Sequence, residues 1–157
     1  MSEGKKILQH NVPEEWIDFN GHMNDAEYVR AFSWGTDALM EFIGMTADFR
    51  DQQQYTMYTL ENHVVYLDEM KLNEAFEVHI HLLDYDAKRL HVFFELYGEN
   101  NKRAATSEQM LMGIDQSTGR PAPFPESVYS KVQALAEQYT PAEKPKEAGR
   151  VIGIKRK

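Results

Sequence analysis

The strongest constraint on the fold is one long helix-like segment that comes before a series of strand-like segments. Apolar residues recur every three to four positions from about residue 25 to 43, which is the period of a helix that buries one face. This stripe consists of Val29, Phe32, Thr36, Leu39, Met40 and Ile43. Asn24 is placed to cap the helix start, Glu27 to complete a capping box, and Gly44 to end the helix. The pattern therefore predicts a central helix with defined ends.

Four strand-like segments follow this helix. They lie at about 55–67, 75–84, 89–98 and 103–114. In the second, apolar residues alternate with Glu77, His79 and His81, as expected for a sheet with one buried and one wet face. Short polar connections between the segments favour hairpins and an antiparallel sheet.

The remaining segments are shorter or more polar. Residues 6–12 predict a first strand, and 126–138 predict a helix. The stretch TADFRDQQQ is polar, and TPAEKPKEAG has the composition of a linker before RVIGIKRK, which is either a last strand or an arm. One helix followed by an antiparallel meander packs well when the sheet curls around the helix, so we predict an α+β hotdog fold. At 157 residues we expect one such domain over 1–138, with a C-terminal tail over 139–157.

Composition narrows the classes of partner. A formal net charge of −8 argues against a broad nucleic-acid surface or an anionic membrane, because both need clustered Lys and Arg. The absence of cysteine excludes disulfides, thiolate zinc sites and a Cys nucleophile. No signal-like or membrane-spanning apolar stretch occurs, so a soluble cytoplasmic protein is the default expectation.

The run Asp18-Phe19-Asn20-Gly21-His22-Met23-Asn24, directly before the helix, carries the chemistry. It combines a carboxylate, a glycine turn and the free N–H groups of a helix N-terminus. Those groups suffice for attack of water on a thioester carbonyl: Asp18 acts as nucleophile or general base, and N–H groups near Gly21 to Met23 stabilise the developing oxyanion.

Four residues of this run also have a structural alternative. Asp18 can cap a turn ahead of Asn20. Gly21 can allow close backbone approach or simply supply a positive φ. The ring or backbone of His22 can contact the thioester, or the ring can pack under the helix. Asn24 suits a helix cap better than a substrate ligand.

Longer segments carry a family resemblance. DFNGHMN followed by AEYVRAF resembles the active-site loop and central helix of hotdog-fold acyl-CoA thioesterases of the 4-hydroxybenzoyl-CoA thioesterase type. TLENHVVYLDE, DAKRLHVFFEL, ATSEQMLMGID and RPAPFP resemble the betainyl-CoA thioesterases that are encoded with, or fused to, carnitine dehydrogenase. The resemblance extends from about Val12 to Pro125.

This resemblance implies hydrolysis of betainyl-CoA to betaine and CoA in carnitine degradation. It also implies a homodimer formed through a shared edge strand, with a dimer of dimers as a further option, and no metal or organic cofactor, because coenzyme A is part of the substrate. The implied catalytic set is Asp18, Gly21, His22, Met23 and Asn24. Aromatic or short-chain acyl-CoA esters, and a non-catalytic acyl-CoA binding module, remain alternatives. No G-x-S-x-G motif of serine hydrolases and no His-Phe-Pro loop of hotdog dehydratases occurs.

Several polar and aromatic residues outside the run are candidates for substrate binding. The candidates are Asn20, Trp34, Tyr58, Glu61, His63, Lys88 and Arg89. Glu61 and His63 share one strand face, either at a dimer seam or as a solvated ion pair. Lys88 and Arg89 suit CoA phosphates or simply solvent.

Aromatic faces would suit a quaternary ammonium group, and Trp34, Tyr28, Tyr58 and Tyr66 are the candidates, although most such rings serve packing. For the pair His79 and His81 we expect a wet sheet face rather than a metal site, because no third ligand is near in sequence.

Overall fold

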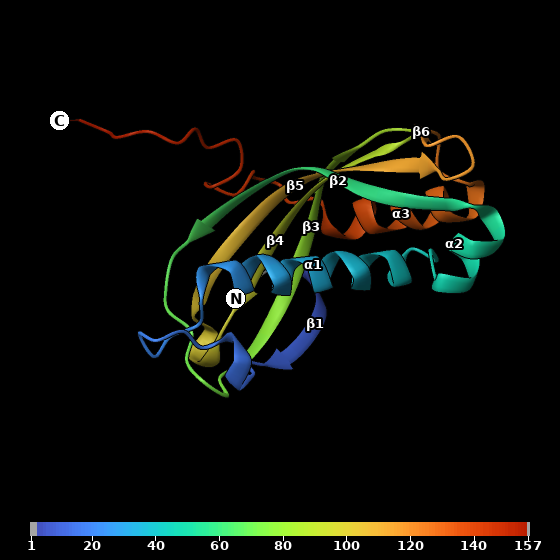
Figure 1. Ribbon diagram of the computed structural model, residues 1–157. Helices are drawn as coiled ribbons and strands as arrows, with labels where there is room; N and C mark the ends of the chain where they lie inside the picture. Colours follow the sequence, from blue (N-terminus) through green and yellow to red (C-terminus); the bar gives the residue numbers. More distant parts are fainter. Residues whose placement is uncertain (1–2, 157) are drawn as a thin grey trace.

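A curled antiparallel sheet wraps around one long helix in the computed structural model, which describes residues 3–156 (Figure 1). The strands are β1 (Lys5–Asn11), β2 (Tyr55–Tyr66), β3 (Ala75–Tyr85), β4 (Arg89–Tyr97), β5 (Arg103–Asp115) and β6 (Arg120–Pro121). The helices are α1 (Asp25–Phe42), α2 (Ala47–Gln53) and α3 (Glu126–Tyr139), with short 3-10 turns at Glu14–Trp16 and Glu99–Asn101. The strand order is β1-β3-β4-β5-β2, with β6 paired to β5, so the predicted hotdog fold is confirmed.

The ends of α1 are specified by local chemistry. The Asn24 side chain accepts a hydrogen bond from the backbone N–H of Ala26 at 2.9 Å, as an N-cap does. The predicted capping box is wrong, because Glu27 instead pairs with Arg30 at 2.8 Å. At the other end Gly44, with φ +86°, donates its N–H to the Glu41 carbonyl, which closes a C-terminal glycine cap.

The buried face of α1 is rotated slightly from the predicted stripe. Phe32, Leu39 and Ile43 are fully buried as predicted, but Val29 is 38% exposed and lies outside the core. Gly35 allows the helix to approach the sheet closely, since a Cβ there would lie 3.1 Å from a methyl group of Val78. The contact surface is therefore centred on the small residues Ala31 and Gly35 rather than on Val29.

The polar stretch after α1 contains a helix that the sequence did not predict. The Thr46 side chain caps α2 by accepting the N–H of Phe49, and none of the seven helical residues is buried. An exposed helix of two turns has no apolar period to detect, so the local cap was the only signal.

The outer face of the sheet, turned away from α1, is not wet as predicted. The side chains of His79 and His81 are only 13% and 7% exposed. The segment after α3 lies on this face, where Glu147 is buried against Arg103, so its interpretation as a plain linker is also wrong. Residues 151–156 form neither strand nor helix and run away from the body of the molecule, as an arm does (Figure 1). No helix within residues 3–156 is long and apolar enough to cross a bilayer.

Candidate active site

The loop before α1 is a compact turn built by its own hydrogen bonds. The Asp18 N–H donates to the His22 carbonyl, and the Gly21 N–H donates to the Asp18 carbonyl, both at 3.0 Å. Gly21 has φ +83°, a conformation that favours glycine. Phe19 at the tip is 98% exposed.

Asp18 is both a turn cap and an available carboxylate. Its Oδ1 accepts the N–H of Asn20 at 2.8 Å, which is the structural role considered from sequence. Its Oδ2 has no hydrogen-bond partner within residues 3–156. The cap fixes the orientation of the carboxylate while one oxygen stays open to a ligand, so the two roles are compatible. The catalytic role of Asp18 stays a prediction.

The backbone donors at the helix start differ from the predicted set. The N–H groups of Gly21 and Met23 are already used, the latter on the Met70 carbonyl at 2.9 Å. Within the described part of the chain, the N–H groups of His22 and Asp25 meet no acceptor. Asp25 was missed from sequence, although the first residue after an N-cap always leaves its N–H without an intrahelical partner.

The His22 ring lies at the surface beside an acidic partner. Its Nε2 is 3.1 Å from Oε2 of Glu69, and the two side chains are 38% and 67% exposed. The ring is therefore held by Glu69 rather than packed under α1. Sequence reasoning missed Glu69, which is 47 positions away and approaches the loop only because β2 ends beside it.

A small polar cavity of about 180 Å³ lies between α1 and the edge strand β2. It is lined by Val29, Ser33, Thr36, Thr59, Asn62 and Gln109. Three hydrogen bonds connect its wall: Thr36 to Gln109 at 3.3 Å, Gln109 to Ser107 at 2.9 Å, and Ser107 to Asn62 at 2.6 Å. A buried polar chain beside an apolar helix face suits a small polar ligand group.

Tyr66 places an aromatic ring at the start of α1. Its hydroxyl donates to the backbone carbonyl of Asp25 at 3.0 Å, and Tyr28 packs edge-on against it with ring centroids 5.2 Å apart. Burial raises the pKa of Tyr66, and burial raises the pKa of Tyr28 to about 12, so both phenols are neutral at pH 7. The Tyr66 hydroxyl thus fixes this ring at the first residue of α1.

Three of the predicted binding residues share a groove on the outer face. Glu61 and His63 line a hollow of about 550 Å³ together with His91 and Glu108. A neighbouring hollow of about 250 Å³ shares His91 and is lined by Arg89. Arg89 is bound to Asp86 through Nε at 2.7 Å, and the Arg89 guanidinium lowers the pKa of Asp86 to about 2.

The other predicted binding residues lie elsewhere. Trp34 packs against His10 and Trp16, with ring centroids 5.1 and 5.0 Å away, in an aromatic cluster. Tyr58 is 52% exposed on β2, and Asn20 and Lys88 are exposed. A single chain therefore does not gather all the predicted site residues in one pocket.

Comparison with known proteins connects this geometry with a family. Residues 12–132 match the model of the thioesterase-like superfamily. The chain is 41% identical to a betainyl-CoA thioesterase of Pseudomonas aeruginosa, over 98% of both chains. It is 36% identical to part of an L-carnitine dehydrogenase/betainyl-CoA thioesterase of a Rhizobium species, covering 96% of this chain and 30% of that longer protein.

A solved structure has a similar fold. A Staphylococcus aureus protein in complex with CoA superposes with a TM-score of 0.91 and 35% identity, covering 99% of both chains. These matches show that the chain belongs to the thioesterase-like superfamily.

Proposed function

We propose that this chain is a betainyl-CoA thioesterase, which hydrolyses betainyl-CoA to betaine and CoA in the cytoplasm during carnitine degradation. The observation that carries the activity is the Asp18 carboxylate, which keeps one oxygen open on the turn that leads into the N-terminus of α1. The acyl group is inferred from the named relatives, which match this chain over nearly its whole length.

The proposed mechanism uses the two free backbone N–H groups and one carboxylate. The thioester carbonyl lies over the start of α1, where the N–H groups of His22 and Asp25 and the helix dipole favour negative charge on its oxygen. Asp18 either attacks the carbonyl carbon or takes a proton from the attacking water. The new C–O bond forms, the C–S bond breaks, and CoA leaves as a thiolate. When Asp18 is the nucleophile, water then hydrolyses the resulting mixed anhydride and restores the carboxylate. These steps call for neither a metal nor an organic cofactor.

Isotope labelling separates the two routes. Direct attack by Asp18 gives a mixed anhydride; when water opens it at the Asp18 carboxyl carbon, a single turnover in ¹⁸O-water gives an unlabelled product and leaves the label on the enzyme. A general-base route labels the product at once.

We further propose a homodimer that forms through β2. This strand has twelve residues and ends the sheet, and Tyr58 and Leu60 on it are 52% and 50% exposed. An unpaired edge of this length invites pairing with another strand. Pairing of β2 with β2 of a second copy completes the sheet across the two chains.

Antiparallel pairing of this kind would also explain why the predicted site is divided within one protomer. The Tyr66 end of β2 lies at the start of α1, and the other end pairs with Gly113, whose N–H donates to the Lys88 carbonyl. In such an antiparallel pair, the Lys88–Arg89 hairpin of one copy lies near the Asp18 loop of the other. Each CoA ester would then meet residues from both chains.

The test is thiol release from betainyl-CoA, with acetyl-, butyryl- and 4-hydroxybenzoyl-CoA as comparators. Turnover of betainyl-CoA well above the others supports the proposal. Preference for another ester refutes the acyl group alone, and tight binding without thiol release indicates a binding module.

Sedimentation at micromolar concentration tests the dimer, and a monomer mass would refute it.

A further inference from the structure

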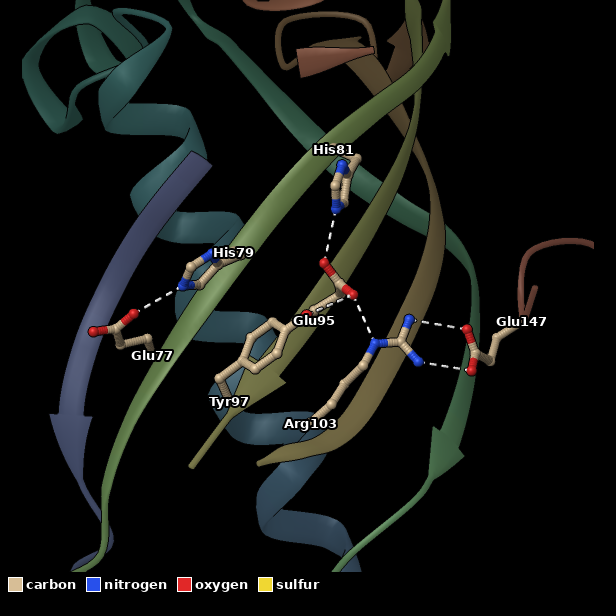
Figure 2. Close-up of polar contacts among 7 residues, drawn as sticks. All are labelled: Glu77, His79, His81, Glu95, Tyr97, Arg103 and Glu147. Atoms are coloured by element: carbon tan, nitrogen blue, oxygen red, sulfur yellow. Dashed lines mark hydrogen bonds and ion pairs between the residues drawn. The ribbon is translucent and has the colours of Figure 1, made fainter. Parts of the chain in front are cut away.

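The segment after α3 is firmly attached to the outer face of the sheet. Glu147 is 4% exposed and accepts two hydrogen bonds from Arg103, at 2.7 and 2.9 Å (Figure 2). Two residues later, the Gly149 N–H donates to the Glu108 carboxylate at 2.7 Å. The course of the chain is therefore fixed as far as Gly149.

The residues beyond this anchor include three exposed apolar side chains. We define the arm as residues 150–156. Its side chains Val151, Ile152 and Ile154 are 86%, 85% and 79% exposed, among the most exposed large apolar side chains in the described part of the chain. Branched apolar side chains held together in water on a segment with a fixed start are typical of a surface that another molecule covers.

The anchor directs the arm toward the free edge of the sheet. Side-chain contacts join His81 on β3 to Glu95 on β4, and Glu95 to Arg103 on β5, which holds Glu147 (Figure 2). Gly149, Arg150 and Ile152 then line the same hollow as Glu61 and His63 of β2. Because β2 is the last strand of the sheet, the arm leaves the molecule beside the strand where a second copy would pair.

We propose that the arm of each copy lies over the outer face of β2 in a second copy, so that a dimer exchanges its two arms. This proposal rests on the proposed homodimer. The seven residues of the arm span about 23 Å when extended, while neighbouring strands are about 4.8 Å apart, so the arm is long enough to cross β2 of the second copy.

Charge fits the same partner. The arm carries Arg150, Lys155 and Arg156, whereas the whole chain has a net charge of −8. The outer face near β2 carries Glu61 and Glu108, which line the hollow there. Arg150 and Ile152 already line the hollow of Glu61 and His63 in their own chain, so an exchanged arm would continue from there across β2 of the other copy.

Cysteine crosslinking tests this geometry directly, because the chain contains no cysteine of its own. An untagged Ile154→Cys variant is mixed with a Val65→Cys variant that carries a tag, so that the two chains differ in mass. Val65 was chosen because it shares the outer strand face with Glu61 and His63. We expect a mixed disulfide dimer under mild oxidation. The matched control is Phe42→Cys, also exposed (43%) but at the C-terminal end of α1, which should give none.

Removing the arm tests its contribution to assembly. A chain ending at Arg150, and the double variant Ile152→Asp with Ile154→Asp, should dimerise at least about tenfold more weakly, whereas Phe42→Asp should dimerise like the wild type. An unchanged dimer affinity overturns the proposal. Arm-dependent binding to phosphatidylserine-containing vesicles, with dimerisation unaffected, overturns it in favour of a membrane contact.

The outcomes separate this proposal from the proposed activity. An active wild-type dimer without the mixed disulfide refutes arm exchange alone. A wild type that crosslinks but cleaves no ester refutes the activity alone, and a monomeric wild type refutes both the dimer and the arm exchange.

Discussion

Two clusters of charged residues in this molecule differ in how they are assembled and in what they leave free. The turn of the Asp18 loop is closed by hydrogen bonds among residues 18–22, and Asp18 itself forms no hydrogen bond with a distant segment within residues 3–156. The outer-face network of His81, Glu95, Arg103 and Glu147 is largely buried and joins four distant segments. Asp18 keeps an oxygen open, whereas both oxygens of Glu95 and of Glu147 already accept hydrogen bonds. The first arrangement suits chemistry and the second suits stability.

The electrostatics of the network agree with this contrast. Burial opposes ionisation of Glu147, but the hydrogen bonds from Arg103 outweigh it, and the pKa of Glu147 lies below its ordinary value. Burial likewise opposes the charge on Arg103, yet Glu147 and Glu95 raise its pKa. Both groups are therefore charged at neutral pH, and each depends on the other to offset the cost of burial.

Substitution of Asp18 should give the largest effect and should separate chemistry from stability. Asp18→Asn keeps an oxygen that can accept the Asn20 N–H but removes the negative charge. We expect kcat to fall by about a thousandfold or more, since general-base or nucleophilic catalysis is lost, with little change in melting temperature. Steady-state thiol release and thermal unfolding measure both. Activity within tenfold of the wild type would mean that the Asp18 loop is structural, like the network.

Substitution of Arg103 should give the opposite pattern. Arg103→Met leaves Glu147 and Glu95 without their cationic partner in a mostly buried site, so we expect about 3 kcal/mol lower free energy of unfolding and a melting temperature about 6–12 °C lower. The kcat per folded molecule should be close to wild type. Arg103→Lys, which keeps the charge but loses the paired hydrogen bonds, should lie between the two; equal stability of all three would remove the network's structural role.

The sequence predicts the Asp18 loop well because its signals are local. The N-cap at Asn24, the glycine of positive φ at Gly21 and the helix that follows are all encoded within a few residues. The five predicted strands also follow from the sequence pattern, and their observed bounds differ from the predicted ones by at most one residue, whereas the two-residue strand β6 was not predicted. The local prediction that was wrong is the capping box, because the Glu27 side chain pairs with Arg30 instead.

The network could not be predicted because no local pattern encodes it. His81 alternates with apolar residues just as a solvent-facing residue does, yet it is buried beside Glu95 and Phe93. TPAEKPKEAG has linker composition, and nothing in that composition reveals that one glutamate meets an arginine 44 positions earlier. The same limit applies to Glu69 beside His22, since the contact depends on where β2 ends.

Lowering the pH should reduce the stabilisation that the outer-face network gains from the charge of Glu147. Because its folded pKa is below the ordinary value, its charge stabilises the fold above about pH 4.3, and this contribution is lost as pH falls through the folded pKa. Glu147→Gln lacks that charge, so we expect it to be less stable than wild type at pH 7, with the gap closing below about pH 4. Urea unfolding at several pH values measures this gap. A gap that stays constant with pH would show that the lost interaction is not ionic.

The smallest predicted effect tests whether the Asp18 loop has any structural role of its own. Asn24→Ala removes the side-chain acceptor for the Ala26 N–H, and loss of an N-cap costs about 1 kcal/mol. Asn24→Ser restores an acceptor without the amide. If Asn24 acts only as a cap, serine should recover stability and activity together in urea unfolding and thiol release.

Recovery of stability without activity would instead make the Asn24 amide a substrate contact. The Asp18 loop would then extend into α1, because Asn24 would serve both the helix and the reaction. Network residues such as Glu147 have no counterpart to that double role, since their polar atoms are already used within the protein. The Asn24 pair of variants therefore locates the boundary between the part of this chain that stabilises and the part that reacts.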